Sequence, residues 1–84
     1  MYSQSTTERF SPEESVEWLA QRMAKVGIST YEELAEITGI DRGTIWRYFN
    51  HERRPRIDVV PILCEALQVS PETILIALGA FNRK

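Results

Sequence analysis

The apolar residues of this chain recur at helical spacing, and no segment shows the strict alternation of apolar and polar residues that a half-buried strand requires. The first helical pattern follows Ser11, Pro12 and Glu14, which together form a helix start. Serine caps free backbone N–H groups, proline occupies the first turn, where its missing donor costs nothing, and glutamate completes a capping box. Gly27 can end this helix in a left-handed conformation. The inward-facing positions are Trp18, Leu19, Met23 and Val26.

Two short helices are predicted next. Thr30 caps the first of them with Glu33 as its capping-box partner, and Gly39 ends it. Asp41 caps the second, which is expected to cover about residues 42–50. The positions expected to face the core are Leu34, Ala35, Ile45, Tyr48 and Phe49.

Two further helices complete the pattern, after a loop around the proline in residues 54–56. Asp58 is expected to cap the fourth helix, and Ser70 starts the fifth, which should run through Leu78 to Gly79. The inward positions expected for the fourth helix are Val59, Ile62, Leu63, Ala66 and Leu67. We therefore predict an all-α, compact five-helix bundle over residues 11–81. Residues 1–10 are expected to be a flexible tail, and residues 82–84 a loose C-terminus.

Composition narrows the class of protein. The chain has 84 residues, of which 43% are hydrophobic, which supports one domain with a small core. Little room is left for a catalytic cleft, and no nucleophile–base or carboxylate pair is evident, so we expect no enzyme and no cofactor. The single cysteine, Cys64, is expected in the core, and His51 in an exposed loop, which leaves no metal cluster. No apolar run approaches the roughly 18 residues of a membrane span, and the N-terminus lacks the apolar core of a signal peptide, so we expect a cytoplasmic protein.

The charge is spread unevenly along the chain. The net charge is −2, but residues 1–40 carry −4, residues 41–56 carry +3 and residues 57–84 carry −1. The basic stretch, GIDRGTIWRYFNHERRPR, surrounds the third predicted helix with five arginines. Because local charge matters more than the total when a ligand docks on one face, this stretch favours an anionic partner.

The second and third predicted helices are joined by the tight turn Gly39-Ile40-Asp41, which is typical of a helix-turn-helix. Ala35 allows the two helices to cross closely, and the turn glycine can adopt a conformation that other residues resist. Arginine presents two parallel donors that fit the O6 and N7 acceptors of guanine. Arg42 and Arg47 lie roughly 7.5 Å apart along a helix that rises about 1.5 Å per residue, so both can reach successive base pairs.

Three segments carry a family resemblance: TYEELAEITGIDRGTIWRYFN, then RRPR, then LCEALQVSPETIL. In helix order and in both turn lengths, the stretch from about Thr30 to Leu75 resembles the phage-repressor-like (XRE) helix-turn-helix family, which includes Cro and the DNA-binding domain of lambda repressor. The resemblance implies a lambda-repressor-like bundle whose helix-turn-helix is formed by helices 2 and 3. It also implies that the third helix enters the major groove of double-stranded DNA.

The same resemblance implies roles for individual residues. The expected base-reading positions are Arg42, Gly43, Thr44, Trp46 and Arg47. The expected phosphate-binding positions are Tyr31, Asn50, Arg53, Arg54 and Arg56. Tyr31 opens the second helix and matches a site that also braces the first residue of the recognition helix.

The chain departs from the family pattern at several positions. Gly43 offers no side chain where many relatives read a base, and His51 and Gln68 replace glycines that are common in the family. Trp46 has two readings: it contacts thymine methyl groups or a partner, or it lies partly buried against a neighbouring helix.

The last predicted helix is too apolar all round for the surface of a monomer, so part of it should form a dimer seam. The candidate residues are Ile74, Ile76, Leu78 and Phe81. Dimeric relatives bind two half-sites about one helical turn apart, roughly 34 Å, which makes a palindromic operator the natural hypothesis.

The predicted function is a sequence-specific transcriptional regulator that binds double-stranded DNA, and a repressor is favoured over an activator. We expect it to bind as a homodimer and to need no small-molecule ligand. The alternative is an antitoxin-like or accessory protein-interaction module that keeps the fold but uses Trp46 and the apolar last helix on a protein partner. The acidic net charge favours the alternative, whereas the arginines of the third helix favour DNA.

Overall fold

The computed structural model describes residues 9–82, and within that range the chain forms five α-helices and no strand. The helices are α1 (Pro12–Val26), α2 (Tyr31–Thr38), α3 (Arg42–Phe49), α4 (Val59–Leu67) and α5 (Pro71–Ala77). The predicted all-α, five-helix bundle is therefore confirmed. The predictions of a flexible tail over residues 1–10 and a loose end over residues 82–84 fall mostly outside the described residues.

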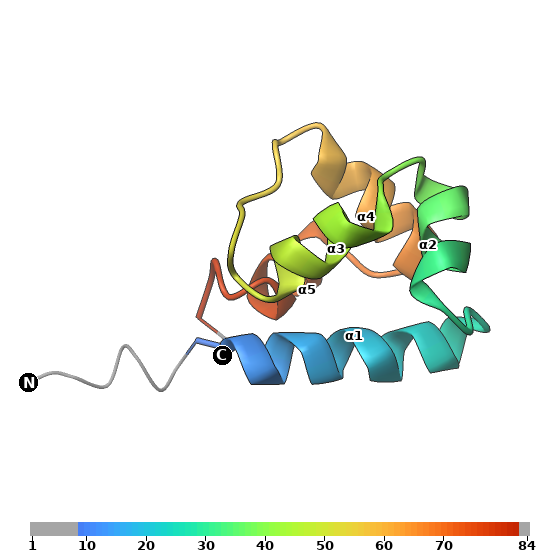
Figure 1. Ribbon diagram of the computed structural model, residues 1–84. Coiled ribbons are helices and arrows are strands. Elements are labelled where there is room, and N and C mark those ends of the chain that lie inside the picture. The colour runs from blue at the N-terminus through green and yellow to red at the C-terminus, as the bar shows by residue number, and fades with distance from the viewer. Residues whose placement is uncertain (1–8, 83–84) are drawn as a thin grey trace, which may run out of the picture.

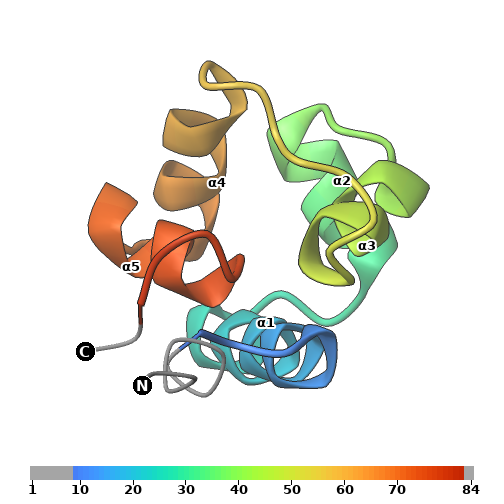
Figure 2. The same cartoon turned by 90° about the vertical axis from the view of Figure 1, so that its left-hand side faces the viewer.

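The longest helix, α1, forms a base on which α3, α4 and α5 pack (Figure 1). Turned by 90°, the molecule shows α2 and α3 on one side and α4 and α5 on the other, with α1 beneath both pairs (Figure 2). Contacts between the helices agree with this view, because α1 touches α3, α4 and α5, and α2 touches α4. The helix-turn-helix pair is thus held from below by α1 and from the side by α4.

The core is built from one face of every helix. Its fully buried large side chains include one or more from each helix: Leu19, Leu34, Ile45, Phe49, Leu63, Leu67, Ile74 and Leu78. Phe49, near the end of α3, stacks on Trp18 of α1 with ring centroids 6.2 Å apart and planes 12° from parallel. Cys64 is buried, as predicted, and burial raises the pKa of its thiol. The stack of Phe49 on Trp18 anchors the last turn of α3 to α1.

The helix starts follow the sequence closely. The Ser11 hydroxyl accepts a hydrogen bond from the N–H of Glu14, whose carboxylate accepts from the N–H of Ser11, so the predicted capping box is complete. At α2, Thr30 accepts from the N–H of Glu33, but the Glu33 carboxylate accepts from Ser29 rather than from Thr30. The capping box at α2 is therefore made in part, because the carboxylate of Glu33 binds the residue before the N-cap instead of the N-cap itself.

The prediction that Asp58 caps α4 is wrong in its chemistry. Asp58 stands at the N-cap position, but its backbone is already helical (φ −76°, ψ −11°) and its side chain makes no capping hydrogen bond. An extended N-cap backbone aims the side chain at the free N–H groups, and a helical one does not. Ile62, predicted to face the core, is 40% exposed.

The predicted dimer seam on α5 also needs correction. Ile74 and Leu78 are 0% and 1% exposed, so both belong to the monomer core and neither can contact a partner. Ile76 is partly exposed, and Phe81 is 52% exposed. Among the described residues no single helix is long and apolar enough to cross a membrane; α4 and α5 reach that length and apolarity only as a pair bent by 97°.

The two aspartates at helix starts allow a matched stability test. Asp41 accepts hydrogen bonds from the N–H groups of Gly43 and Thr44, at 3.0 and 3.3 Å, whereas Asp58 caps nothing. We expect Asp41→Ala to lower the free energy of unfolding by about 1 kcal/mol and Asp58→Ala by less than about 0.5 kcal/mol. Urea denaturation of the two variants and the wild type measures this, and equal losses would contradict the assignment.

Candidate nucleic-acid interface

The turn between α2 and α3 is fixed by hydrogen bonds from three consecutive positions. Gly39 adopts the left-handed conformation (φ 75°) and its N–H donates to the carbonyl of Ala35 at 2.8 Å, which ends α2. The Thr38 hydroxyl donates to the carbonyl of Leu34 and accepts from the N–H of Ile40. Asp41 then caps α3. The relative direction of α2 and α3 is thereby set within four residues of chain.

The two faces of α3 differ sharply in burial. Ile45 and Phe49 are fully buried and Tyr48 is 7% exposed, so the inner face of the helix is part of the core. On the outer face, Arg42 and Arg47 are exposed, and the Trp46 ring is 42% exposed. Thr44 and Gly43 lie at the boundary and are half-buried. The outer face thus offers two guanidinium groups, one indole and one hydroxyl over about two turns.

The guanidinium group of Arg47 lies beside Gly43 on α3. Arg47 follows Gly43 by one helical turn, and helical side chains point back toward the N-terminus. A Cβ built on Gly43 would lie 3.7 Å from Nη1 of Arg47 and 3.1 Å from Oδ2 of Asp41. The Arg47 guanidinium therefore lies over the first turn of α3.

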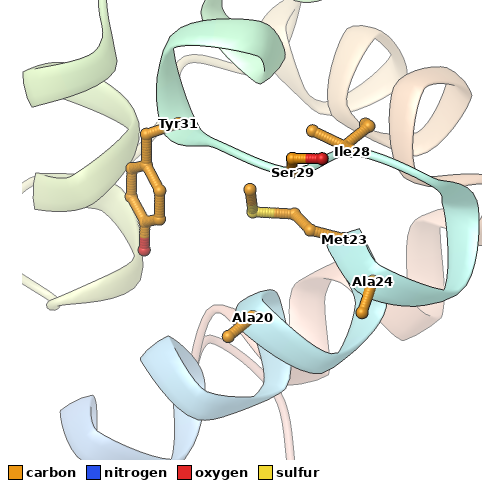
Figure 3. A pocket seen from close by; sticks show the side chains of 6 residues that line it. All are labelled: Ala20, Met23, Ala24, Ile28, Ser29 and Tyr31. Carbon is orange, nitrogen blue, oxygen red and sulfur yellow. The ribbon is translucent and has the colours of Figure 1, made fainter.

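Arg42 is braced by a residue other than the one expected. Its Nη1 donates to Oε2 of Glu32, which lies one position after Tyr31 on α2. Both side chains of this pair are 63% exposed. Tyr31 was the predicted brace, but its ring lies instead at the edge of a hollow of about 330 Å³ between α1 and the start of α2, into which Met23 reaches (Figure 3). Burial of this ring raises the pKa of the Tyr31 phenol.

The loop between α3 and α4 presents the remaining basic side chains. Arg53, Arg54 and Arg56 are all exposed. Arg54 also donates from Nη1 to the carbonyl of Leu78 at 3.2 Å, which ties the middle of the loop to the end of α5. The amide of Asn50 donates to the carboxylate of Glu52 at 2.8 Å. Of the expected phosphate-binding residues in this loop, Arg53 and Arg56 are therefore less tied to the rest of the fold than Asn50 and Arg54 are.

His51 is not the exposed loop residue that the sequence suggested. It is half-buried, and one of its ring nitrogens, Nε2, lies 2.8 Å from the hydroxyl of Ser15, the one buried polar side chain among residues 9–82. Its backbone is left-handed (φ 64°), a conformation that costs about 1–2 kcal/mol for a residue other than glycine. Gly79 permits this placement, because a Cβ there would lie 2.4 Å from Cε1 of the ring. His51 thus joins the end of α3 to α1 and to the segment after α5.

Two residues that the sequence analysis missed matter here: Glu32 and Ser15. Ser15 carried a usable signal, because it precedes Leu19 and Met23 at four-residue spacing on the buried stripe of α1. Gln68, like His51, is left-handed (φ 59°), which fits its place where the family has glycine. Within residues 9–82, no three histidine, cysteine or acidic side chains lie together as a metal ion would require.

The His51 contact predicts a pH dependence of stability. Burial, followed by the positive charge of Arg54, lowers the pKa of His51 below its usual 6.5, and Glu13 acts in the opposite direction. Between the lowered value and 6.5 the unfolded chain binds a proton that the folded protein does not, so stability should fall as the pH decreases below about 6.5. His51 is the only histidine, so His51→Asn, which tolerates the left-handed backbone, should flatten this dependence. Thermal melts between about pH 7.5 and 5.5 measure it, and equal slopes for both proteins would contradict the assignment.

The comparisons with known proteins agree with this geometry. Residues 19–78 match a family model described as the Cro/C1-type HTH DNA-binding domain, and the match covers all of α2, α3, α4 and α5. No match was found among curated proteins or among solved structures. The phage-repressor-like resemblance is confirmed, and it supports a regulator that binds double-stranded DNA. This chain belongs to the Cro/C1-type helix-turn-helix DNA-binding domain family.

Proposed function

We propose that this protein is a sequence-specific transcriptional repressor of the cytoplasm, which binds a palindromic operator as a homodimer and acts without chemistry or cofactor. One observation carries the proposal. The outer face of α3 exposes Arg42, Trp46 and Arg47, while its inner face is fixed in the core by Ile45 and Phe49. A rigid helix with two arginines on its free face suits the major groove, which admits one α-helix.

In this proposal each exposed side chain of α3 has a chemical role. Arg47 reads guanine through its two parallel donors, and its position over Gly43 places it near the N-terminal end of the helix, where recognition helices contact bases. The apolar edge of Trp46 suits the methyl group of thymine. Arg42 contacts DNA from the first turn of the helix, either with its ion pair to Glu32 kept or after that ion pair has broken. The half-buried hydroxyl of Thr44 serves a phosphate or a base edge.

The loop after α3 supplies the backbone contacts. Arg53 and Arg56 extend into solvent next to the recognition helix, as phosphate binding requires. The start of α2 is less suited than the sequence suggested, because Glu32 and Glu33 occupy its first turn and repel phosphate. Tyr31 remains the phosphate-binding candidate on this helix. Most of the nonspecific affinity for DNA therefore rests on the arginines of the loop between α3 and α4.

Selection from a randomised duplex pool at physiological salt, followed by sequencing, tests the proposal. The expected result is a two-fold symmetric motif with half-sites about 10 base pairs apart. An unenriched pool, obtained with protein shown to be folded, would overturn the proposal and leave the protein-partner alternative.

Replacing Arg47 should change specificity. Arg47→Ala removes a bidentate contact with one base pair, so discrimination at that position should fall by about 1–3 kcal/mol while the remaining positions keep their preference. Competition binding against duplexes that differ at single positions measures this. An unchanged preference at every position would show that Arg47 does not read a base.

Replacing Arg53 should change affinity without changing specificity. Arg53→Ala should weaken binding to all sequences alike and lower the slope of log K against log salt by about 1. Arg53 is a cleaner choice than Arg54, whose replacement also removes the hydrogen bond to Leu78. Lys25→Ala, on the last turn of α1, is the matched control and should leave the slope unchanged. A loss confined to one sequence would contradict a phosphate contact.

A further inference from the structure

Glu32 places a carboxylate beside the outer face of α3, which carries Arg42 and Arg47. It is the second residue of α2, and its Oε2 accepts a hydrogen bond from Nη1 of Arg42, the first residue of α3. The two helices pack against each other (Figures 1 and 2), so this pair links both elements of the helix-turn-helix. Base reading by an arginine does not itself require a carboxylate, and a carboxylate repels the phosphates of DNA.

The contact with Glu32 uses only part of the Arg42 guanidinium. Arginine carries five N–H donors, and the edge formed by Nε and Nη2 is not used by Glu32. Within residues 9–82, no acceptor binds that edge. Its two parallel donors match the O6 and N7 acceptors of guanine. Arg42 can therefore keep its ion pair with Glu32 and read a base at the same time.

The carboxylate also determines which kind of acceptor is favourable for Arg42. Both side chains of the pair are 63% exposed, so DNA has access to them. A phosphate bound to Arg42 lies close to the negative charge of Glu32, whereas the edge of a base pair carries no net charge. Phosphate binding is therefore penalised, and base reading is not. The ion pair also restricts the guanidinium before DNA binds, which reduces the entropy lost when it is fixed on a base.

Arg47 offers a comparison on the same helix. Its guanidinium lies beside Gly43 and has no carboxylate partner within residues 9–82. The two arginines of α3 thus differ in what holds them. Any effect of Glu32 on sequence preference should be confined to the base pair that Arg42 contacts.

We propose that Glu32 is a specificity-determining residue that acts through Arg42, by keeping its guanidinium off the phosphates and directing it to a guanine. The proposal rests on the proposed function, because it requires that α3 reads the major groove. Without the carboxylate, Arg42 keeps its own charge but binds a phosphate as readily as a base. Glu32 therefore lowers the affinity for all DNA and raises the discrimination between sequences.

Glu32→Gln tests the proposal, because it removes the charge and keeps the size of the side chain. Discrimination at the base pair that Arg42→Ala identifies should fall about fivefold, the upper value for an exposed ion pair. Binding to nonspecific duplex should strengthen, and the slope of log K against log salt should steepen by about 1, because the released arginine contacts a phosphate. Competition binding against duplexes changed at single positions, at several salt concentrations, measures both quantities.

Glu36→Gln is the matched control. Glu36 is also an exposed glutamate of α2 and lies one turn after Glu32, but it does not pair with Arg42. Its replacement changes the net charge equally and should leave discrimination at every position unchanged. A double variant, Glu32→Gln with Arg42→Ala, should discriminate as Arg42→Ala does alone, because Glu32 acts only through that side chain. Urea denaturation measures stability, since an acid in the first turn of α2 also stabilises the helix.

Three results would overturn the proposal: no base pair whose recognition depends on Arg42, unchanged discrimination in Glu32→Gln, or a double variant that loses more than Arg42→Ala alone. A Glu32→Gln protein that is less stable and binds all sequences more weakly would also overturn it, because a purely structural role has that effect.

These outcomes are separate from the fate of the proposed function. A wild-type protein that selects an operator, with every preference kept in Glu32→Gln, would reject the role of Glu32 and keep DNA reading. A wild-type protein that selects no sequence would reject the proposed function and this role with it.

Discussion

The proposed DNA-binding surface depends on the burial of one side of a helix that is only eight residues long. With Ile45, Tyr48 and Phe49 in the core, the rotation of α3 about its axis is fixed. At 3.6 residues per turn, the positions between them must then face solvent. Trp46 and Arg47 are exposed for that reason, whereas Arg42 is exposed at the first position of the helix. The stack of Phe49 on Trp18 transmits the same constraint to α1. An isolated helix of this length would not be stable in water, so its order comes from packing.

Acidic and basic side chains lie on different parts of this scaffold. The acidic residues lie mainly on α1 and α2, and the arginines on α3 and the following loop, so the net charge of −2 conceals a strongly polar distribution. An anion is attracted to one side and repelled by the other, which orients it before contact. Glu32 is the exception, because it brings a carboxylate to the edge of the basic face. Its negative charge repels an anion there, and its hydrogen bond holds Arg42 in place.

The sequence predicted what depends on neighbours along the chain. Caps at Ser11, Thr30, Asp41 and Ser70 and the turn at Gly39 were readable, because a cap and its helix lie within a few residues. The prediction of a side-chain cap at Asp58 was wrong, because capping depends on the backbone angles of the residue as well as on its type. Periodicity predicted the apolar face of α4, but it did not predict that Ile62 on that face is 40% exposed.

Contacts between distant positions lay beyond sequence reasoning. The hydrogen bond of His51 with Ser15 spans 36 residues, and that of Arg54 with Leu78 spans 24. Glu32 and Arg42 are ten residues apart and meet only because the turn folds α2 against α3. The base-reading and phosphate-binding residues came from family resemblance. What the structure adds is which of those side chains are exposed and which are already engaged within the fold.

The central claim is that the outer face of α3 and the loop after it bind DNA. Titration of ¹⁵N-labelled protein with a duplex, followed by amide chemical shifts, tests it most directly. The account predicts that the largest shift changes fall within residues 41–56, with smaller changes near Tyr31 and little change along the exposed face of α1. Changes confined to α1, or to α4 and α5, would contradict it.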